Sequence, residues 1–191
     1  MIGTILISAV VILATSVLAR WGQVLAERWL APKLEMRYHH STHGRVHVEA
    51  NGHNTVHVRI NVTNSKRRMA RNCRAYLADL EKRIDGEWRR LLWDTVQLRW
   101  SSLWANGSVF EVDVPHDVTF RVDLFNTVEG DIHFSPLAQM PNYYKPESCG
   151  EYRFTVVVTA EGATTVRKQF TLRCDRDWQN FEFDMDRSAE R

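Results

Sequence analysis

The chain has 191 residues, of which 44% are hydrophobic and 25% are charged, and its formal net charge is +2. This composition suits a globular domain and excludes a nucleic-acid partner dictated by overall charge alone. About 150 residues follow the apolar N-terminal segment, enough for one domain with one hydrophobic core.

The first predicted element is a transmembrane helix at residues 2–19. The segment has no charged residue, no proline and one glycine, and as a helix it would span ~27 Å, close to the hydrocarbon thickness of a bilayer. Its apolar side chains lie on every face of the helix, which favours a lipid surrounding. Two alternatives stay open: a signal peptide cleaved before Arg20, which would lack the usual basic start, and a buried core helix.

The charges after this segment predict its orientation. The flanking basic residues outnumber the acidic ones, with Arg20, Arg28, Lys33 and Arg37 against Glu27 and Glu35. By the positive-inside rule, the C-terminal domain of this single-pass membrane protein is expected in the cytoplasm.

Residues 20–31 continue the helical period beyond the predicted membrane span. The candidate membrane-interface residues are Arg20, Trp21, Arg28 and Trp29. The two tryptophans share one helix face and suit the headgroup boundary, where the arginines would meet anionic phosphates. In the alternative, the tryptophans pack on the domain. Pro32 ends the helix, so residues 1–31 form the transmembrane and juxtamembrane unit.

From residue 34 onward, apolar and polar residues alternate, and this pattern predicts a mainly β domain. The clearest strand is 56–63, with valine and isoleucine at every second position. Further strands are expected at 34–40, 44–50, 73–82, 95–100, 108–114, 117–125, 130–135, 151–160, 164–174 and 178–185. Residues 161–163 read as a hairpin turn. Many short strands predict an antiparallel sandwich or barrel, with an immunoglobulin-like β-sandwich as the first choice.

Some segments fit the strand pattern less well. Residues 76–84 also match an amphipathic helix, because Leu77, Leu80 and Ile84 are spaced at helical intervals. Residues 136–149 contain three of the five prolines and predict a long loop. The β-sandwich domain is assigned to 32–186, and 187–191 is expected to be a frayed charged tail.

Three segments carry a family resemblance: Val-Arg-Ile-Asn-Val-Thr-Asn at 58–64, Ala-Arg-Asn-Cys-Arg-Ala-Tyr-Leu at 70–77, and Leu-Arg-Trp-Ser at 98–101. They resemble uncharacterised bacterial membrane-anchored proteins with an immunoglobulin-like domain, in which a strand ends in Asn, a basic loop follows and an Asn-Cys strand pairs back. The resemblance covers about half the chain. It implies a bacterial source and a sandwich, and it carries no known activity or site residues.

The chain contains three cysteines, Cys73, Cys149 and Cys174. An odd number without CxxC spacing argues against a complete disulfide framework and against a cysteine zinc site. We expect buried, reduced thiols. A bridge between Cys73 and Cys174 is the alternative for an exported domain.

Six of the eight histidines lie between residues 39 and 57. Clustered imidazoles suggest a metal site or a pH sensor, and His47 and His57 are the candidates because both are expected on the polar side of neighbouring strands. No HExxH or HxH motif accompanies them. Solvated histidines are therefore the main expectation, and no metal or other cofactor is predicted.

A basic loop joins two predicted strands near residue 65. Its candidate patch consists of Lys66, Arg67, Arg68 and Arg71. Such a run is most often simply solvated. If it binds a partner, tethering near a bilayer favours anionic lipid, and nucleic acid is not expected because no RNA-binding or helix-turn-helix signature is present.

Four tryptophans interleaved with arginines form the candidate binding aromatics Trp88, Trp93, Trp100 and Trp104. Aromatic and arginine clusters are typical of binding hot spots. A sandwich of this size also buries one or two tryptophans in its core, and this is the competing interpretation.

No nucleophile elbow, P-loop, dinucleotide glycine motif or SxxK is present, so we do not expect an enzyme. We expect a membrane-tethered binding or scaffold module for an unidentified protein partner at the inner membrane face. The alternatives are a membrane-anchored hydrolase or metal-dependent enzyme, and an exported envelope binding protein. Polar side chains converging in a deep pocket would favour the enzyme.

Overall fold

The computed structural model describes residues 18–27, 29–39, 45–50, 53–92, 94–101, 109–128, 131–134, 147–174 and 181–185. The chain divides into two compact units, Met1–Ala31 and Pro32–Arg191. Apart from residues 18 and 19, the predicted membrane span lies outside the described residues. Among the helices that are described, none combines the length and apolarity needed to cross a bilayer.

The first unit contains a helix at residues 18–27 and 29–30, which confirms the helix predicted after the apolar segment. Gln23 Nε2 donates a hydrogen bond of 3.2 Å to Glu27 Oε1, one helical turn further on. Trp21 and Trp29 are exposed on this helix. Arg28 lies outside the described residues.

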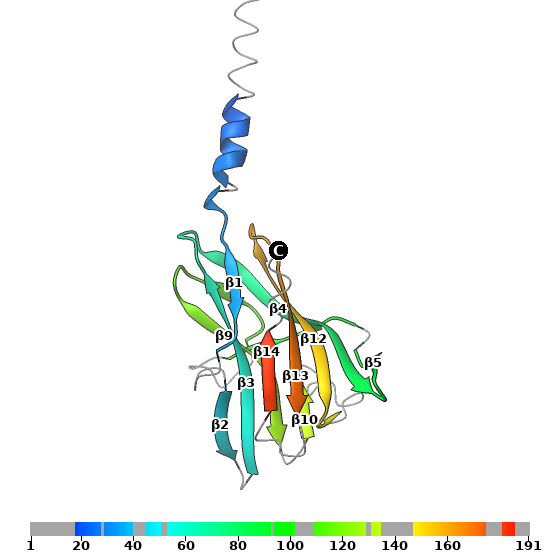
Figure 1. The fold of residues 1–191 in the computed structure, drawn as a ribbon. Helices are drawn as coiled ribbons and strands as arrows, with labels where there is room; N and C mark the ends of the chain where they lie inside the picture. Colours follow the sequence, from blue (N-terminus) through cyan, green and yellow to red (C-terminus); the bar gives the residue numbers. More distant parts are fainter. Residues whose placement is uncertain are drawn as a thin grey trace, which may run out of the picture. The chain divides into compact units, whose positions relative to one another are not determined.

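The second unit is built from two antiparallel sheets, and this confirms the mainly β, sandwich-like fold (Figure 1). The first sheet contains β1 (Leu34–Arg37), β2 (Arg45–Ala50), β3 (His53–Asn64), β7 (Arg99–Ser101), β9 (Thr119–Val128), β10 (Asp131–Phe134) and β11 (Glu147–Ser148). The second contains β4 (Ala70–Ile84), β5 (Glu87–Arg90), β6 (Val96–Gln97), β8 (Val112–Val114), β12 (Glu151–Glu161), β13 (Val166–Cys174) and β14 (Phe181–Met185).

The order of strands within each sheet is simple. In the first sheet β3 and β9 are central: β1 and β2 pair one after the other along the free side of β3, and β7 and β10 pair along the far side of β9. In the second sheet the order is β14, β13, β12, β4 and β5. The β12–β13 hairpin predicted around 161–163 is present, with Gly162 at φ +66° in the turn.

The core lies between the sheets and follows from the alternation read in the sequence. In β3, Val56, Val58, Ile60 and Val62 are all fully buried, while the residues between them are only partly covered. A pleated strand turns successive side chains to opposite faces, so one face of β3 meets the second sheet.

Aromatic rings fill the centre of this core. Phe154 of β12 lies 5.7 Å from Phe170 and 5.8 Å from Phe183, measured between ring centroids, and both pairs are stacked. Phe125 of β9 meets Phe154 edge-on at 6.3 Å, and it also contacts Phe134 at 5.8 Å. Rings from both sheets therefore interlock, which ties the two layers together.

The helical alternative for residues 76–84 is wrong, because β4 runs unbroken through this segment. A β-bulge explains the ambiguity: Leu77 pairs with Val156 and Asp79 with Thr155, so Ala78 has no opposite residue. One extra residue shifts the alternation by one position. Leu77 and Leu80 are consequently both buried at a spacing that resembles a helix.

The turn between β4 and β5 was not predicted. Asp85 and Gly86 form a two-residue connection, with φ values of +53° and +85°. Both residues adopt the left-handed conformation that a type I′ hairpin needs, and Asp-Gly is a strong signal for such a turn. The sequence therefore contained the information for this hairpin.

The cysteine prediction is wrong for two of the three thiols. Cys149 and Cys174 form a disulfide, with 5.0 Å between their Cα atoms, while Cys73 is free and buried. The alternative Cys73–Cys174 bridge is also wrong. Cys73 on β4 lies beside the end of β12, whereas Cys174 on β13 lies beside its start. The length of β12 therefore separates the two cysteines by about 30 Å.

Candidate functional site

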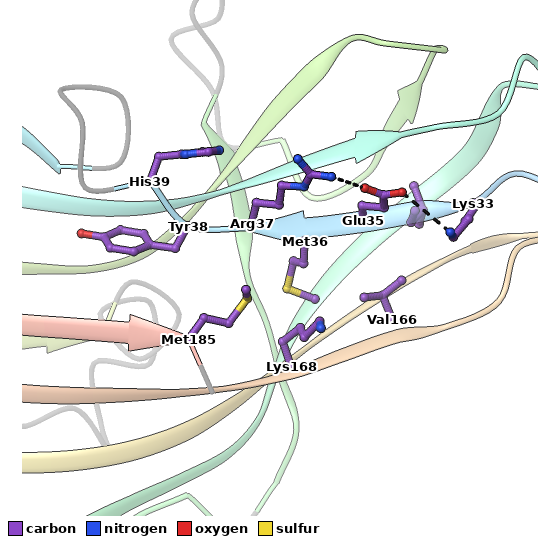
Figure 2. A pocket seen from close by; sticks show the side chains of 10 residues that line it. Lys33, Glu35, Met36, Arg37, Tyr38, His39, Val166, Lys168 and Met185 are labelled. Carbon is purple, nitrogen blue, oxygen red and sulfur yellow. Dashed lines mark hydrogen bonds and ion pairs between the residues drawn. The ribbon is translucent and has the colours of Figure 1, made fainter. Parts of the chain in front are cut away.

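The candidate site is a groove at the edge of the sandwich, where β1 of the first sheet faces β13 and β14 of the second (Figure 2). Its volume is about 510 Å³, which is within the range of small-ligand and short-segment sites. The lining residues are Lys33, Leu34, Glu35, Met36, Arg37, Tyr38, His39, Val166, Lys168 and Met185.

A strand edge borders this groove. Within the described residues, β1 pairs only with β3. Such an edge carries backbone groups that can pair with an added strand. On the opposite side of the groove, β13 pairs with β12 and, over residues 170–174, with β14.

The pairing pattern of β1 shows which of its backbone groups point to the groove. The Ser65 N–H donates a hydrogen bond of 2.9 Å to the Lys33 carbonyl, so Lys33 bonds toward β3. Backbone groups alternate in direction along an antiparallel strand. The N–H and C=O groups of Leu34 and Met36 consequently face away from β3, toward the open edge.

The floor of the groove is apolar and adaptable. Met36 is buried, Leu34 lies beside it, and Val166 and Met185 line the opposite side. In Figure 2 the Met36 and Met185 side chains point into the space below β1. Because methionine is flexible and polarizable, this floor can adjust to differently shaped apolar side chains.

One end of the groove is closed by an aromatic contact. The Tyr38 ring, just after β1, meets the Phe183 ring of β14 edge-on, with 4.4 Å between centroids. This contact joins the two sheets at the groove. Edge-to-face aromatic packing of this kind favours a fixed ring orientation.

The described lining of the groove contains more basic than acidic residues: Lys33, Arg37 and Lys168 are basic, and Glu35 is acidic. Arg37 Nη2 donates a hydrogen bond of 2.8 Å to Glu35, and the Lys33 ammonium lies 3.8 Å from the same carboxylate. The Arg37 hydrogen bond in particular lowers the pKa of Glu35. Glu35 therefore stays ionised at pH values below the usual range of a glutamate.

The predicted basic patch lies on the loop that joins β3 to β4 and on the first residues of β4, which include Arg71. Arg67, Arg68 and Arg71 are exposed, and Lys66 is partly covered. Lys66 is held to the end of β3, because its N–H donates to Asn64 Oδ1 at 3.1 Å.

The predicted aromatic cluster does not form around the two tryptophans that the structure describes. Trp100 of β7 is 2% exposed and packs edge-on against Phe120 at 6.3 Å. Trp88 is on β5 in the other sheet, with the Arg153 guanidinium 4.6 Å from its ring centroid. Trp100 is thus a core residue, and Trp93 and Trp104 lie outside the described residues.

The two candidate histidines do not form a cross-strand pair. The β2–β3 register pairs His47 with Val56 and His57 with Val46. Each histidine is therefore opposite a valine, and the two histidines are one register step away from being opposite each other. In the described part of the chain, no three His, Cys, Asp or Glu side chains gather closely enough to hold a metal ion.

His57 has an altered titration for a structural reason. Burial, followed by the nearby positive charge of Arg59, lowers the pKa of His57. The folded chain thus favours the neutral imidazole, and the unfolded chain binds more protons in mildly acidic solution. The contribution of His57 to the free energy of unfolding is fully present above the unfolded pKa of about 6.5 and decreases as the pH falls below that value.

The groove itself was not identified from the sequence. The alternation of Leu34 and Met36 with Lys33 and Arg37 predicted a half-buried strand, but nothing local indicated that Lys168 lies across from it. A sequence separation of more than 130 residues hides this proximity. Neither the models of known protein families nor the curated proteins include a match to this chain.

Proposed function

We propose that this chain is a membrane-tethered binding module that captures an extended segment of a partner protein in the β1–β13 groove. The observation that carries the proposal is the β1 strand edge beside a floor that contains Met36 and Met185. An added peptide would bond to the Leu34 and Met36 backbone and place alternate side chains in the groove. The basic residues of the lining favour a segment with acidic side chains.

The tether in this proposal is the apolar segment 2–19, continued by the helix that carries Trp21 and Trp29. Anchoring raises the local concentration of the module at the bilayer, so moderate affinity suffices. The hydrolase alternative has no observation in its favour, and we propose binding instead of catalysis.

A finer fold assignment accompanies the proposal. Immunoglobulin strands are named A to G in chain order. If β1 and β2 are strand A, β3 is B, β9 is E and β7 is D, the first sheet has the order ABED. In the second sheet, β4 then corresponds to C, β12 to F and β13 to G. This is the strand order of an immunoglobulin-like domain. In it, β14 would be an additional strand beyond G.

Two observations disagree about the side of the membrane on which the domain lies. The charge bias after residue 19 favours the cytoplasm. The Cys149–Cys174 disulfide favours an oxidising compartment outside it. We give the disulfide more weight, since four basic residues diluted by two acidic ones form a weak topological signal. The proposed module is therefore the exported form, facing the cell envelope.

Reporter fusions after Arg191 test this orientation. A phosphatase that is active only outside the cytoplasm should be active, and a fluorescent protein that matures only in the cytoplasm should be dark. The N-terminal segment should remain on the chain by mass measurement. A fluorescent, phosphatase-negative fusion would contradict the exported orientation, and loss of the segment would contradict the tether.

Peptide selection tests the groove. The full chain in lipid nanodiscs is exposed to a displayed library of random nine-residue peptides. We expect enrichment of peptides that alternate apolar and acidic residues, and binding should protect the Leu34 and Met36 amides from hydrogen exchange. Lys168→Glu should weaken binding by about tenfold, because it reverses the charge at the groove.

A matched control is available on the same strand. Arg167 precedes Lys168, but its side chain is exposed and does not line the groove. Arg167→Glu makes the same charge change and should leave peptide binding nearly unchanged. Equal losses in both variants would indicate general electrostatic attraction and would contradict a groove site, as would peptide binding without amide protection.

A further inference from the structure

A single buried side chain organises the end of the sandwich at which the chain enters the domain. Asn64, at the end of β3, is 0% exposed. Its Oδ1 accepts hydrogen bonds from the N–H groups of Lys33 at 3.2 Å and Lys66 at 3.1 Å. Its Nδ2 donates to the carbonyls of Arg68 at 2.8 Å and Val114 at 3.2 Å. The start of β1, the basic loop and the end of β8 are thereby held together.

The segment after β8 is held at the same place. The Asp117 N–H donates a hydrogen bond of 3.1 Å to the Asn64 carbonyl. Ala70 pairs with Val114, which sets the beginning of β4 beside the end of β8. The loop 65–69 and the segment 115–118 are therefore neighbours. We call this surface the entry end of the domain.

The entry end carries more basic than acidic residues. Its basic residues are Lys33, Lys66, Arg67, Arg68 and Arg71, and its acidic residues are Glu35, Asp113, Asp117 and Glu161. Arg71 is opposite Glu161 in the β4–β12 register, so part of this charge is compensated. The arginines at 67 and 68 are exposed on the loop itself.

Exposed apolar side chains occur among these charges. Met69 is 36% exposed and Val118 is 43% exposed, in the two neighbouring segments. Apolar side chains surrounded by lysine and arginine are the combination that binds the boundary between anionic headgroups and acyl chains.

The covalent connection makes a bilayer the nearest partner for this surface. Only Ala31 and Pro32 separate Leu30, the last helical residue, from Lys33, which is bonded to Asn64. Three residues of extended chain reach about 10 Å at most. Residues 20–30 add about 16 Å of helix beyond the predicted span, so a helix anchored in a membrane would keep Lys33 within about 26 Å of the headgroups.

We propose that the entry end is a membrane-contact surface, in which Met69 and Val118 enter the headgroup boundary and the basic residues of segment 65–71 bind anionic lipid. This inference rests on the tether in the proposed function but not on the groove. It predicts that the module is oriented by the lipid surface in addition to being held by the helix.

Fluorescence quenching in reconstituted vesicles tests the contact. The full chain carries a fluorophore at Met69→Cys, and a spin-labelled headgroup lipid is the quencher. We expect strong quenching in vesicles of phosphatidylcholine with phosphatidylglycerol, and weak quenching in phosphatidylcholine alone or at high salt. The buried Cys73 and the bridged cysteines should not take up the label.

Two controls make the result specific. Glu87→Cys carries the label at the start of β5, opposite Ile84 at the far end of β4 and about 45 Å away along that strand, and should stay unquenched in both lipids. Replacing Lys66, Arg67, Arg68 and Arg71 by glutamine should reduce quenching at position 69 to the level in phosphatidylcholine. Equal quenching in both lipids, or no effect of the glutamines, would overturn the inference.

The outcome is separable from that of the proposed function. Lys168→Glu should weaken peptide binding by about tenfold without changing quenching at position 69. A chain that carbonate washing removes from the vesicles would overturn the tether, and this inference with it. Peptide binding that fails while anionic quenching persists would overturn only the groove.

Discussion

Phe154→Ala is expected to lower the free energy of unfolding by about 3–5 kcal/mol, the usual cost of deleting a buried phenylalanine ring. Phe154 is 1% exposed and contacts aromatic rings from both sheets, including Phe125 and Phe170. Its removal leaves a cavity at the place where the layers interlock. Urea unfolding of the full chain in nanodiscs, followed by tryptophan fluorescence, measures the change.

An exposed ring provides the matched control. Phe110 is 37% exposed and contacts the Arg99 guanidinium at 6.0 Å from the ring centroid. Phe110→Ala should cost about 1 kcal/mol or less, since little apolar surface is lost from the core. A Phe154→Ala loss as small as that of Phe110→Ala would show that the aromatic layer is not tightly packed.

Removing the disulfide is expected to cost about 3–4 kcal/mol. Cys149 and Cys174 are separated by 25 residues, and closing a loop of this length reduces the entropy of the unfolded chain by roughly that amount. The variant changes both cysteines to serine, and its unfolding is compared with that of the wild type. The wild type should lose a similar amount when a reductant is added.

Thiol counting checks whether the bond is present in the cell. Alkylation of the denatured chain without reductant should add one group, at Cys73, and alkylation after reduction should add three. In the native chain none should react readily, because burial raises the pKa of Cys73 to about 11 and covers its sulfur. Three groups without reductant would mean a reducing compartment and would overturn the exported orientation.

The predicted fold rests on strands whose signals are local. The alternation in 56–63 identified β3, and the turn at 161–163 identified the last long hairpin, because both depend on neighbouring residues. The Asp85–Gly86 hairpin was equally local and was overlooked. Segment 76–84 could not be assigned from local signals, because the bulge at Ala78 gives its apolar residues helical spacing. The pairing of this segment with β12 decides in favour of a strand over a helix.

The candidate site was predictable only in part. The four cations of the basic patch lie within six consecutive residues, so the sequence alone shows that they are neighbours along the chain. The groove combines residues near position 36 with Lys168 and Met185. A local sequence pattern does not show that residues so far apart in the chain are close in space. His47 and His57 were close in sequence, but a single step in register separates them.

Local patterns were enough to identify the apolar segment, the helix after it, and a mainly β domain with a basic loop, because periodicity and charge are properties of adjacent residues. Contacts between distant residues set which cysteines pair, place Trp100 in the core, and bring the β1 edge beside β13 at the groove. Those outcomes depend on strand register and sheet order. Both are set by contacts between residues far apart in the chain. Burial of the whole core favours one strand register over the register shifted by one residue.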